Sequence, residues 1–141
     1  MSTSNAFSGV GTLFQRGDEA SAQNFATIAE VNSISGPNMT RGVIDVTSLD
    51  STGGYREFIA SFRDGGEVVL DMNFTLAGYD DLKLDFEDSD KRHYQIVLPD
   101  TGNTTFKFHG LVTALGLAVP NDDKVKATCT VKISGQVELA S

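Results

Sequence analysis

Residues 125–139 read VKATCTVKISGQVEL, and their side chains alternate between apolar and polar almost without interruption. A period of two is the pattern of a strand with one buried face. A strand of this length is unusual in a small sandwich and needs partners that are also long. Its predicted buried face consists of Val125, Ala127, Cys129, Val131, Ile133, Val137 and Leu139.

A second clear alternation occurs in residues 67–76, EVVLDMNFTL. Its predicted apolar face consists of Val68, Leu70, Met72, Phe74 and Leu76. Shorter strand-like runs, separated by turn sequences such as residues 35–38 (SGPN) and 64–66 (DGG), fill most of the remaining chain.

Residues 78–90 have a different pattern, because Tyr79, Leu82 and Phe86 follow helical spacing among mostly acidic neighbours. They predict one amphipathic helix, whose acidic side chains form either a solubilising face or an assembly surface. The whole pattern predicts a mainly β chain, an antiparallel β-sandwich or barrel with one flanking α-helix.

The first 24 residues are rich in Ser, Gly, Asn and Ala and show no period of 2 or 3.6. We therefore expect a flexible N-terminal arm over residues 1–24 and a single β-domain over residues 25–141. Leu13 and Phe14 are among the few apolar residues of this arm and favour a docking role for it. A frayed terminus is the alternative.

The charge balance limits the classes of function. The chain has 141 residues and a net charge of −8. Gripping the phosphates of nucleic acid requires clustered Lys and Arg, so this acidity argues against a nucleic-acid-binding protein. No apolar run approaches the roughly 20 residues of a membrane span, and no secretory signal is visible. A single cysteine is typical of a protein made in a reducing cytoplasm.

The sequence predicts no enzyme, no catalytic residue, no metal site and no cofactor. His93 and His109 are the only histidines and fall on the polar faces of predicted strands, while Cys129 falls on an apolar face. No phosphate-binding or dinucleotide-binding loop is present. The acidic pairs lack the glycine-centred spacing of a calcium loop.

Several segments, in order along the chain, resemble the tail tube (major tail) proteins of long-tailed bacteriophages. Together they extend the resemblance over about residues 26–139. The segments are TIAEVNSISGP (27–37), IDVTSLDS (44–51), GGYREFI (53–59) with DGGEV (64–68), and DDKV (122–125) through VKISG (131–135).

The resemblance implies a structural protein of the virion tail, assembled in the host cytoplasm. Proteins of this family form six-membered rings that stack into a hollow tube, and the genome crosses the lumen without specific binding. The implied partners are further copies of the chain, the tail tip or initiator complex, and the tape measure and tail terminator proteins.

The resemblance also implies an interface. In the family, a long loop between the second and third strand regions contacts the adjacent ring, and it matches residues 49–64 here. A loop folded onto its own domain is the alternative. Glu67 and Asp71, on the polar face of the predicted strand, are the candidates for acidic residues of the lumen. The candidate interface residues are Leu49, Asp50, Tyr55, Arg56, Glu57, Phe58 and Arg63, with Leu13 and Phe14 from the N-terminal arm.

Two other functions stay open at this point. A tube protein of a contractile injection or secretion system shares the ring architecture. A monomeric β-sandwich binding module, for example for carbohydrate, would need an exposed aromatic platform. The chain has no tryptophan, and most of its aromatic residues fall on predicted buried faces.

Overall fold

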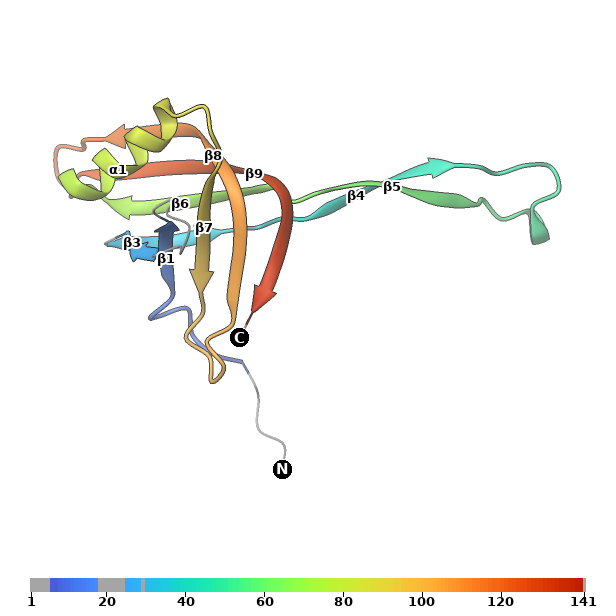
Figure 1. Cartoon of the computed structure of the whole chain (residues 1–141), viewed down its shortest axis with the longest axis horizontal. Helices are drawn as coiled ribbons and strands as arrows, with labels where there is room; N and C mark the ends of the chain where they lie inside the picture. The colour runs from blue at the N-terminus through green and yellow to red at the C-terminus, as the bar shows by residue number, and fades with distance from the viewer. Residues whose placement is uncertain (1–5, 18–24, 29, 141) are drawn as a thin grey trace.

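The computed structural model of the chain describes residues 6–17, 25–28 and 30–140. They form a curled β-sheet body from which a long two-stranded hairpin projects (Figure 1). One α-helix, α1 (Leu76–Glu87), and one 3-10 turn, η1 (Thr52–Gly54), occur in this described part of the chain. The strands are β1 (Leu13–Gly17), β2 (Phe25–Thr27), β3 (Val31–Ser35), β4 (Thr40–Asp45), β5 (Phe58–Asp64), β6 (Glu67–Asn73), β7 (Arg92–Val97), β8 (Thr105–Ala118) and β9 (Lys126–Ala140).

The body is one antiparallel sheet of seven strands in the order β2-β1-β7-β8-β9-β6-β3. Only residues 28–30 separate the two edge strands β2 and β3 in the sequence, so the edges of the sheet must lie close together. The Ile28 N–H donates to the Phe14 carbonyl at 2.9 Å and extends the β1–β2 pairing into this short connection, and the Asn73 N–H at the end of β6 donates to the Glu30 carbonyl at 3.0 Å beside β3. The sheet is therefore a partly closed barrel, which confirms the predicted antiparallel β fold with one flanking helix.

The long last strand has the long partner that its sequence requires. β8 has 14 residues and β9 has 15, and they pair over most of their length. The first half of β8 also pairs with β7, and the first half of β9 pairs with β6. The two long strands thus join both sides of the barrel.

The core lies inside this barrel and confirms the two alternating patterns over most of their length. Val68, Leu70 and Met72 of β6 are fully buried, as are Val131 and its apolar neighbours on β9. The predicted pattern is wrong at the ends of both stretches. β6 ends at Asn73, where the chain leaves the sheet to begin α1, and the next apolar side chains are exposed: Phe74 at 37% and Leu76 at 78%. At the end of β9, Leu139 is 67% exposed.

Helix α1 covers one end of the barrel (Figure 1). The side-chain oxygen of Thr75 accepts a hydrogen bond from the Gly78 N–H at 3.2 Å and caps the helix. Leu82 is fully buried, as its spacing predicts. Phe86 is 49% exposed, and Asp85 takes the buried position beside it instead. The prediction for Phe86 is wrong because apolar spacing cannot anticipate a buried carboxylate. No helix in the described residues is long and apolar enough to cross a membrane.

The expected N-terminal arm differs from the structure where it is described. Residues 13–17 form β1, which pairs with β7 on one side and β2 on the other. Phe14 is fully buried and stacks on Tyr94, with 5.5 Å between the ring centroids. Its assignment to a subunit interface is therefore corrected, because its side chain fills the core. Leu13 points to the opposite face and is 38% exposed. Residues 1–5 and 18–24 of the expected arm lie outside the described residues.

Candidate assembly interface

The projecting hairpin, residues 39–64, is built from two strands that pair only with each other. β4 and β5 are in register from Thr40 opposite Asp64 at the root to Asp45 opposite Phe58 farther out. The outer edge of each strand therefore has backbone donors and acceptors without a strand partner in the described chain. Such edges are suited to pairing with another chain.

The tip of the hairpin, residues 46–57, is a defined turn. The Ser51 hydroxyl accepts a hydrogen bond from the Ser48 N–H at 3.0 Å, and the Ser51 N–H donates to the Ser48 carbonyl at 3.1 Å. Gly53 and Gly54 follow with positive φ angles of 69° and 74°. Glycine adopts this conformation without the strain that a β-carbon would add.

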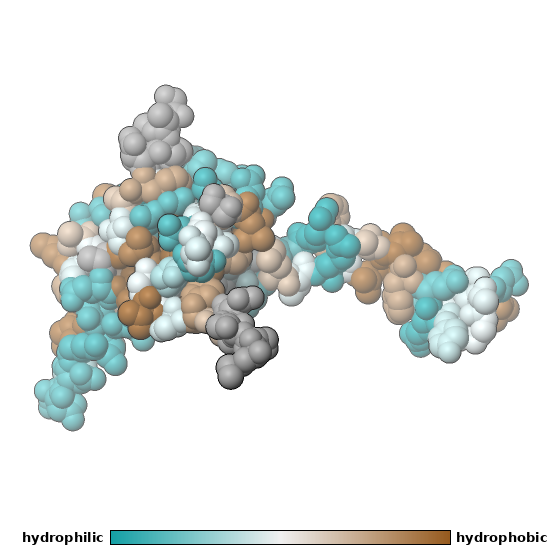
Figure 2. All heavy atoms as spheres, turned by 90° about the horizontal axis from the view of Figure 1, so that it is seen from below, coloured by the Kyte–Doolittle hydropathy of each residue, from teal (hydrophilic) through white to brown (hydrophobic). Residues whose placement is uncertain are grey.

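Large apolar side chains cover the hairpin but remain exposed. Leu49 is 106% exposed, Phe62 92% and Tyr55 78%. Figure 2 shows hydrophobic colour in the middle of the projecting segment, between more hydrophilic stretches nearer the body and at the tip. Many exposed large apolar side chains on one projecting segment are typical of a protein contact site in a soluble protein. The exposed apolar residues of the hairpin are Met39, Val43, Ile44, Val46, Leu49, Tyr55, Phe58, Ile59 and Phe62.

Polar contacts and close packing fix the hairpin to the barrel at its root. Lys132 Nζ on β9 lies 3.1 Å from Asp64 Oδ1, and the Gly66 N–H donates to the same oxygen at 2.8 Å. The hydrogen bond from Gly66, and then Lys132, hold the pKa of Asp64 below its usual value. The Ile133 N–H donates to the Gly66 carbonyl at 3.0 Å. Gly66 has a φ of +79°, and a β-carbon there would meet the Asn38 carbonyl oxygen at 2.1 Å.

A hollow lies between this root and β9. Arg41 and Arg63 are directly opposite each other in the β4–β5 register, and both line the hollow. Both are exposed, and neither takes part in an ion pair within the described residues. Like charges in directly opposed positions destabilise a strand pair, so this position favours an anionic partner. The lining is completed by residues 39, 40, 42, 61, 62, 64, 65, 133 and 135–137.

Seven of the sequence-predicted interface residues lie together on the hairpin. Their contacts with another subunit stay a prediction. Leu49, Asp50 and Tyr55 belong to the tip, and Arg56 and Glu57 follow them. The last two, Phe58 and Arg63, are in β5. The predicted loop 49–64 is therefore the tip and second strand of a hairpin. Arg56 forms its ion pair with Asp45, at 3.5 Å.

Sequence reasoning did not include the first strand of the hairpin in the candidate interface. Val43 and Ile44 lie in one of the shorter strand-like runs of the sequence, and all of β4 is exposed. The missed residues also include Met39, Arg41 and Phe62. The turn at residues 64–66, which follows β5, was the available signal, because it marks where the second hairpin strand ends.

Glu67 and Asp71 lie on the outward face of β6. Glu67 is opposite Lys132 of β9 in register, and Lys126 lies on the same outward face farther along β9. The outward face of β6 and β9 is therefore mixed in charge. Which face lines a lumen is not determined by a single subunit, so the lumen assignment of Glu67 and Asp71 stays a prediction.

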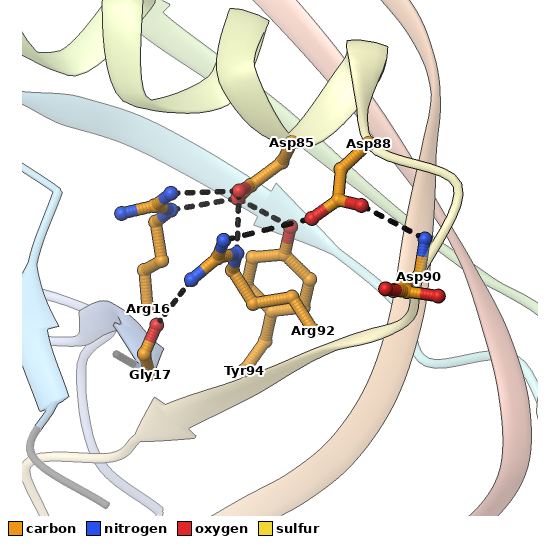
Figure 3. Close-up of polar contacts among 7 residues, drawn as sticks. All are labelled: Arg16, Gly17, Asp85, Asp88, Asp90, Arg92 and Tyr94. Atoms are coloured by element: carbon orange, nitrogen blue, oxygen red, sulfur yellow. Dashed lines mark hydrogen bonds and ion pairs between the residues drawn. The ribbon is translucent and has the colours of Figure 1, made fainter. Parts of the chain in front are cut away.

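A buried ionic cluster attaches α1 to the sheet (Figure 3). Asp85 is 3% exposed and accepts hydrogen bonds from Arg16 Nε and Nη2, each at 2.7 Å. Arg92 Nε lies 2.5 Å from Asp85 Oδ1, and the Tyr94 hydroxyl donates to Oδ2 at 2.7 Å. The hydrogen bond to Asp85 raises the pKa of Arg16, and burial is the main cause of the raised pKa of Tyr94. The Arg92 guanidinium also donates to the Gly17 carbonyl at 3.0 Å, so the cluster connects α1, β1 and β7.

The histidines and the cysteine, the residues considered as candidates for catalysis or metal binding, do not come together with other such residues in the described structure. His93 and His109 are adjacent across β7 and β8, with 2.5 Å between their Nε2 atoms. Partial burial, and then His93, lower the pKa of His109. Burial raises the pKa of the Cys129 thiol to about 12. In the described residues, no three His, Cys, Asp or Glu side chains are grouped to hold a metal ion.

The sequence matches the family described as lambda phage tail tube protein, TTP, over residues 6–140. The chain belongs to this family. It is a structural protein of phage-like tails and not an enzyme, which confirms the resemblance noted in the sequence. No curated protein sequence matches this tail tube protein.

Solved structures share the fold of this tail tube protein. A chain in the tail of an empty gene transfer agent particle, with C6 symmetry, aligns with a TM-score of 0.79 and 23% identity and covers 96% of this chain and 100% of its own. A chain in the sheath/tube terminator of the extracellular contractile injection system PVC aligns with a TM-score of 0.70 and 14% identity. The alignment covers 99% of this chain and 100% of the PVC chain. A chain of the SPP1 tail tube aligns with a TM-score of 0.65 and 7% identity. The alignment covers 89% of this chain and 74% of the SPP1 chain.

Proposed function

We propose that this tail tube protein forms six-membered rings that stack into a hollow tube, and that DNA leaves the particle through the lumen. The observation that carries the proposal is the hairpin, which projects from the barrel of its own subunit and has exposed apolar side chains along its length. The C6 symmetry reported for the similar gene transfer agent tail supports a ring of six.

The hairpin is suited to bind a neighbouring ring because it extends beyond its own subunit. A contact between the hairpin of one copy and a different surface of the next is heterologous, and repetition of such a contact along an axis generates a filament. Burial of the exposed apolar side chains supplies the favourable free energy, at about 25 cal/mol per Å² of apolar surface.

The proposed partners follow from the open ends of such a stack. One end presents free hairpins and the other presents the surface that receives them, so a tip or initiator complex and a terminator have to cover different surfaces. The similar PVC chain belongs to a sheath/tube terminator, which supports a terminator as a partner. A tape measure protein would occupy the lumen, and assembly would take place in the host cytoplasm.

We assign Glu67 and Asp71 to the lumen wall. Carboxylates there would repel the DNA backbone and keep it from adhering during passage. Lys132 and Lys126 lie on the same outward face and would limit that repulsion. Loss of either acid would therefore leave the lysines in excess on this face.

The hairpin is tested by assembly of purified, tag-free protein, followed by negative-stain electron microscopy and size-exclusion chromatography. We expect hollow six-fold rings or tubes for the wild type and none for Leu49→Ser/Tyr55→Ser. The matched control, Leu49→Met/Tyr55→Phe, retains the apolar surface and should assemble. Circular dichroism should be the same for all three proteins, because both side chains lie outside the core. A wild-type protein that stays monomeric and also fails to add to isolated tail tips would contradict the proposal.

The lumen assignment has a separate test. Tubes of Glu67→Lys or Asp71→Lys should assemble normally but release DNA poorly, whereas Glu67→Gln should have a smaller effect. Wild-type infectivity of particles that carry either lysine variant would exclude these residues from the lumen.

Among the other functions considered, membership of the lambda family argues against a monomeric binding module. It also favours a tail of the lambda type over a contractile injection system. The similarity to the PVC chain concerns the fold alone, at 14% identity.

A further inference from the structure

The arginine pair, Arg41 and Arg63, is unusual for a strand pair in an acidic protein. The two guanidinium groups are directly opposed at the root of the hairpin, and no carboxylate of the described chain forms an ion pair with either one. Nearby acids are already occupied, because Asp64 pairs with Lys132 and Asp45 pairs with Arg56. The subunit therefore places two like charges together without neutralising them.

An acidic surface lies at the opposite end of the barrel. Two residues separate the end of the hairpin from β6, and β6 stops shortly before α1, so its full length separates the hairpin root from α1. Seven strand residues span about 23 Å. The turn between β8 and β9 lies at the α1 end, because the Phe74 N–H donates to the Val125 carbonyl at 3.0 Å. We call Asp80, Asp81, Asp122 and Asp123 the acidic end.

Within their own subunit, Asp81 interacts with Arg16 and Asp123 with Lys124 and Lys126, whereas no ion pair of the described residues includes Asp80 or Asp122. Among the described residues, only Asp123 of the four forms an ion pair, with Lys126 at 3.7 Å. Asp80 and Asp122 are exposed. Exposed apolar side chains, such as Leu76 at 78% and Val119 at 69%, lie beside these acids and could pack on the apolar part of the hollow.

We propose that the arginine pair of one copy binds carboxylates of the acidic end of a second copy in the next ring. This inference rests on the proposed head-to-tail stacking, in which the hairpin end of one subunit meets the α1 end of the next. Guanidinium–carboxylate hydrogen bonds at the root would fix the direction of stacking. Two copies that met hairpin end to hairpin end would instead bring four arginines together.

Charge reversal tests the proposal. Arg41→Glu/Arg63→Glu and Asp80→Lys/Asp122→Lys should each lower the amount of sedimented tube at least tenfold. The chain that carries all four substitutions has complementary charges at every ring junction and should assemble again. Lys91→Glu/Lys107→Glu is the matched control, since it alters net charge as much as the arginine variant but at exposed positions on the body.

The outcomes separate this inference from the proposed function. Wild-type protein that forms tubes, together with both reversal variants that also form tubes, would overturn the arginine contact and leave ring stacking intact. If both reversal variants are folded but form no tubes, and the folded four-substitution chain also forms no tubes, the acidic end is overturned as the partner. Absence of rings and tubes in the wild type would instead count against the proposed function.

Chemical cross-linking provides a measurement that does not depend on reversed charges. In Arg41→Lys/Arg63→Lys tubes, the positive charges remain, and a carbodiimide can join either lysine to a carboxylate that it contacts. We expect cross-linked peptides that connect residue 41 or 63 to residues 76–87 or 119–124, and no such peptides from dissociated subunits. Cross-links only to other segments would overturn the assignment.

Discussion

Lys132 on β9 holds Asp64, the last residue of β5, through an ion pair in which Nζ lies 3.1 Å from Oδ1 and 3.3 Å from Oδ2. Two elements that are far apart in the sequence thereby meet where the hairpin leaves the barrel. The contact is one of several at the root that hold the hairpin, because β4 and β5 pair with no other strand of the described chain.

Removal of this ion pair should loosen the hairpin and leave the barrel intact. In Lys132→Ala, amide hydrogen exchange of residues 62–66 should become several-fold faster, while the melting temperature changes little because both groups are exposed. Lys126→Ala, on the same face of β9, is the matched control and should leave these amides unchanged.

The Asp64 contact also has a pH dependence. Its pKa in the folded protein is lowered, so its stabilising effect is present above the unfolded value of about 3.9 and is lost as the pH falls through the folded value. Equal exchange rates in Lys132→Ala and wild-type protein at neutral pH would show that this ion pair does not hold the root.

Gly66 should be far less tolerant of a side chain than Gly54. Gly66→Ala places a β-carbon 2.1 Å from the Asn38 carbonyl oxygen at a φ of +79° and should lower the free energy of unfolding by more than about 2 kcal/mol. Gly54→Ala has a similar φ of +74° but open space around it, so only the backbone strain of about 1–2 kcal/mol applies. Denaturant unfolding compares the two variants, and equal losses would contradict the proposed close approach at the root.

The buried cluster around Asp85 should dominate the stability of the α1 end. Asp85→Asn leaves two largely buried guanidinium groups, Arg16 and Arg92, without their carboxylate and should cost about 3–5 kcal/mol. Tyr94→Phe removes one hydrogen bond to a charged group and should cost about 2 kcal/mol. Asp88→Asn is the control, because its contact with Arg92 is 3.8 Å long and partly exposed. A loss below about 1 kcal/mol for Asp85→Asn would show that the cluster is not a stabilising connection.

Cys129 should be unreactive in the folded subunit. Its thiol is 1% exposed and its pKa is raised to about 12, so reaction with a thiol reagent at pH 8 should be at least about 100-fold slower than in denaturant. An exposed thiol in Thr128→Cys/Cys129→Ala should react rapidly in the native protein. Because the unfolded thiol ionises near about pH 8.5, stability should decline as the pH rises above that value. Rapid native labelling of Cys129 would contradict its burial.

The sequence predicts the barrel strands β6 and β9 well because each has one buried face over most of its length. Val68, Leu70 and Met72 alternate with polar residues for that reason, and so do the core residues of β9. Phe14 was misassigned because its strand is short and lies among Ser-rich and Gly-rich residues without a visible period. Asp85 was missed because its partner Arg16 is 69 residues away in the sequence.

The interface was predictable only in part, and for a different reason. Both faces of β4 are exposed, so the apolar pattern of Val43 and Ile44 indicates a strand but not whether its partner is its own barrel or another chain. The resemblance to tail tube proteins predicted an interface in the distal half of the hairpin, including Leu49 and Tyr55, and this stays a prediction. The arginine pair required the strand register, which brings Arg41 and Arg63 together across 22 residues of sequence.

The isolation of β4 and β5 from the main sheet has a kinetic consequence. A two-stranded ribbon without further support is at best marginally stable in water, so we expect the part of the hairpin beyond its root to sample several conformations in a free subunit. Docking must select one of them, and the lost conformational entropy raises the barrier to association of the first few subunits. An existing ring end presents its receiving surface already ordered and lowers that barrier. Tube growth should therefore begin with a lag in pure protein and without one when preformed ends are added.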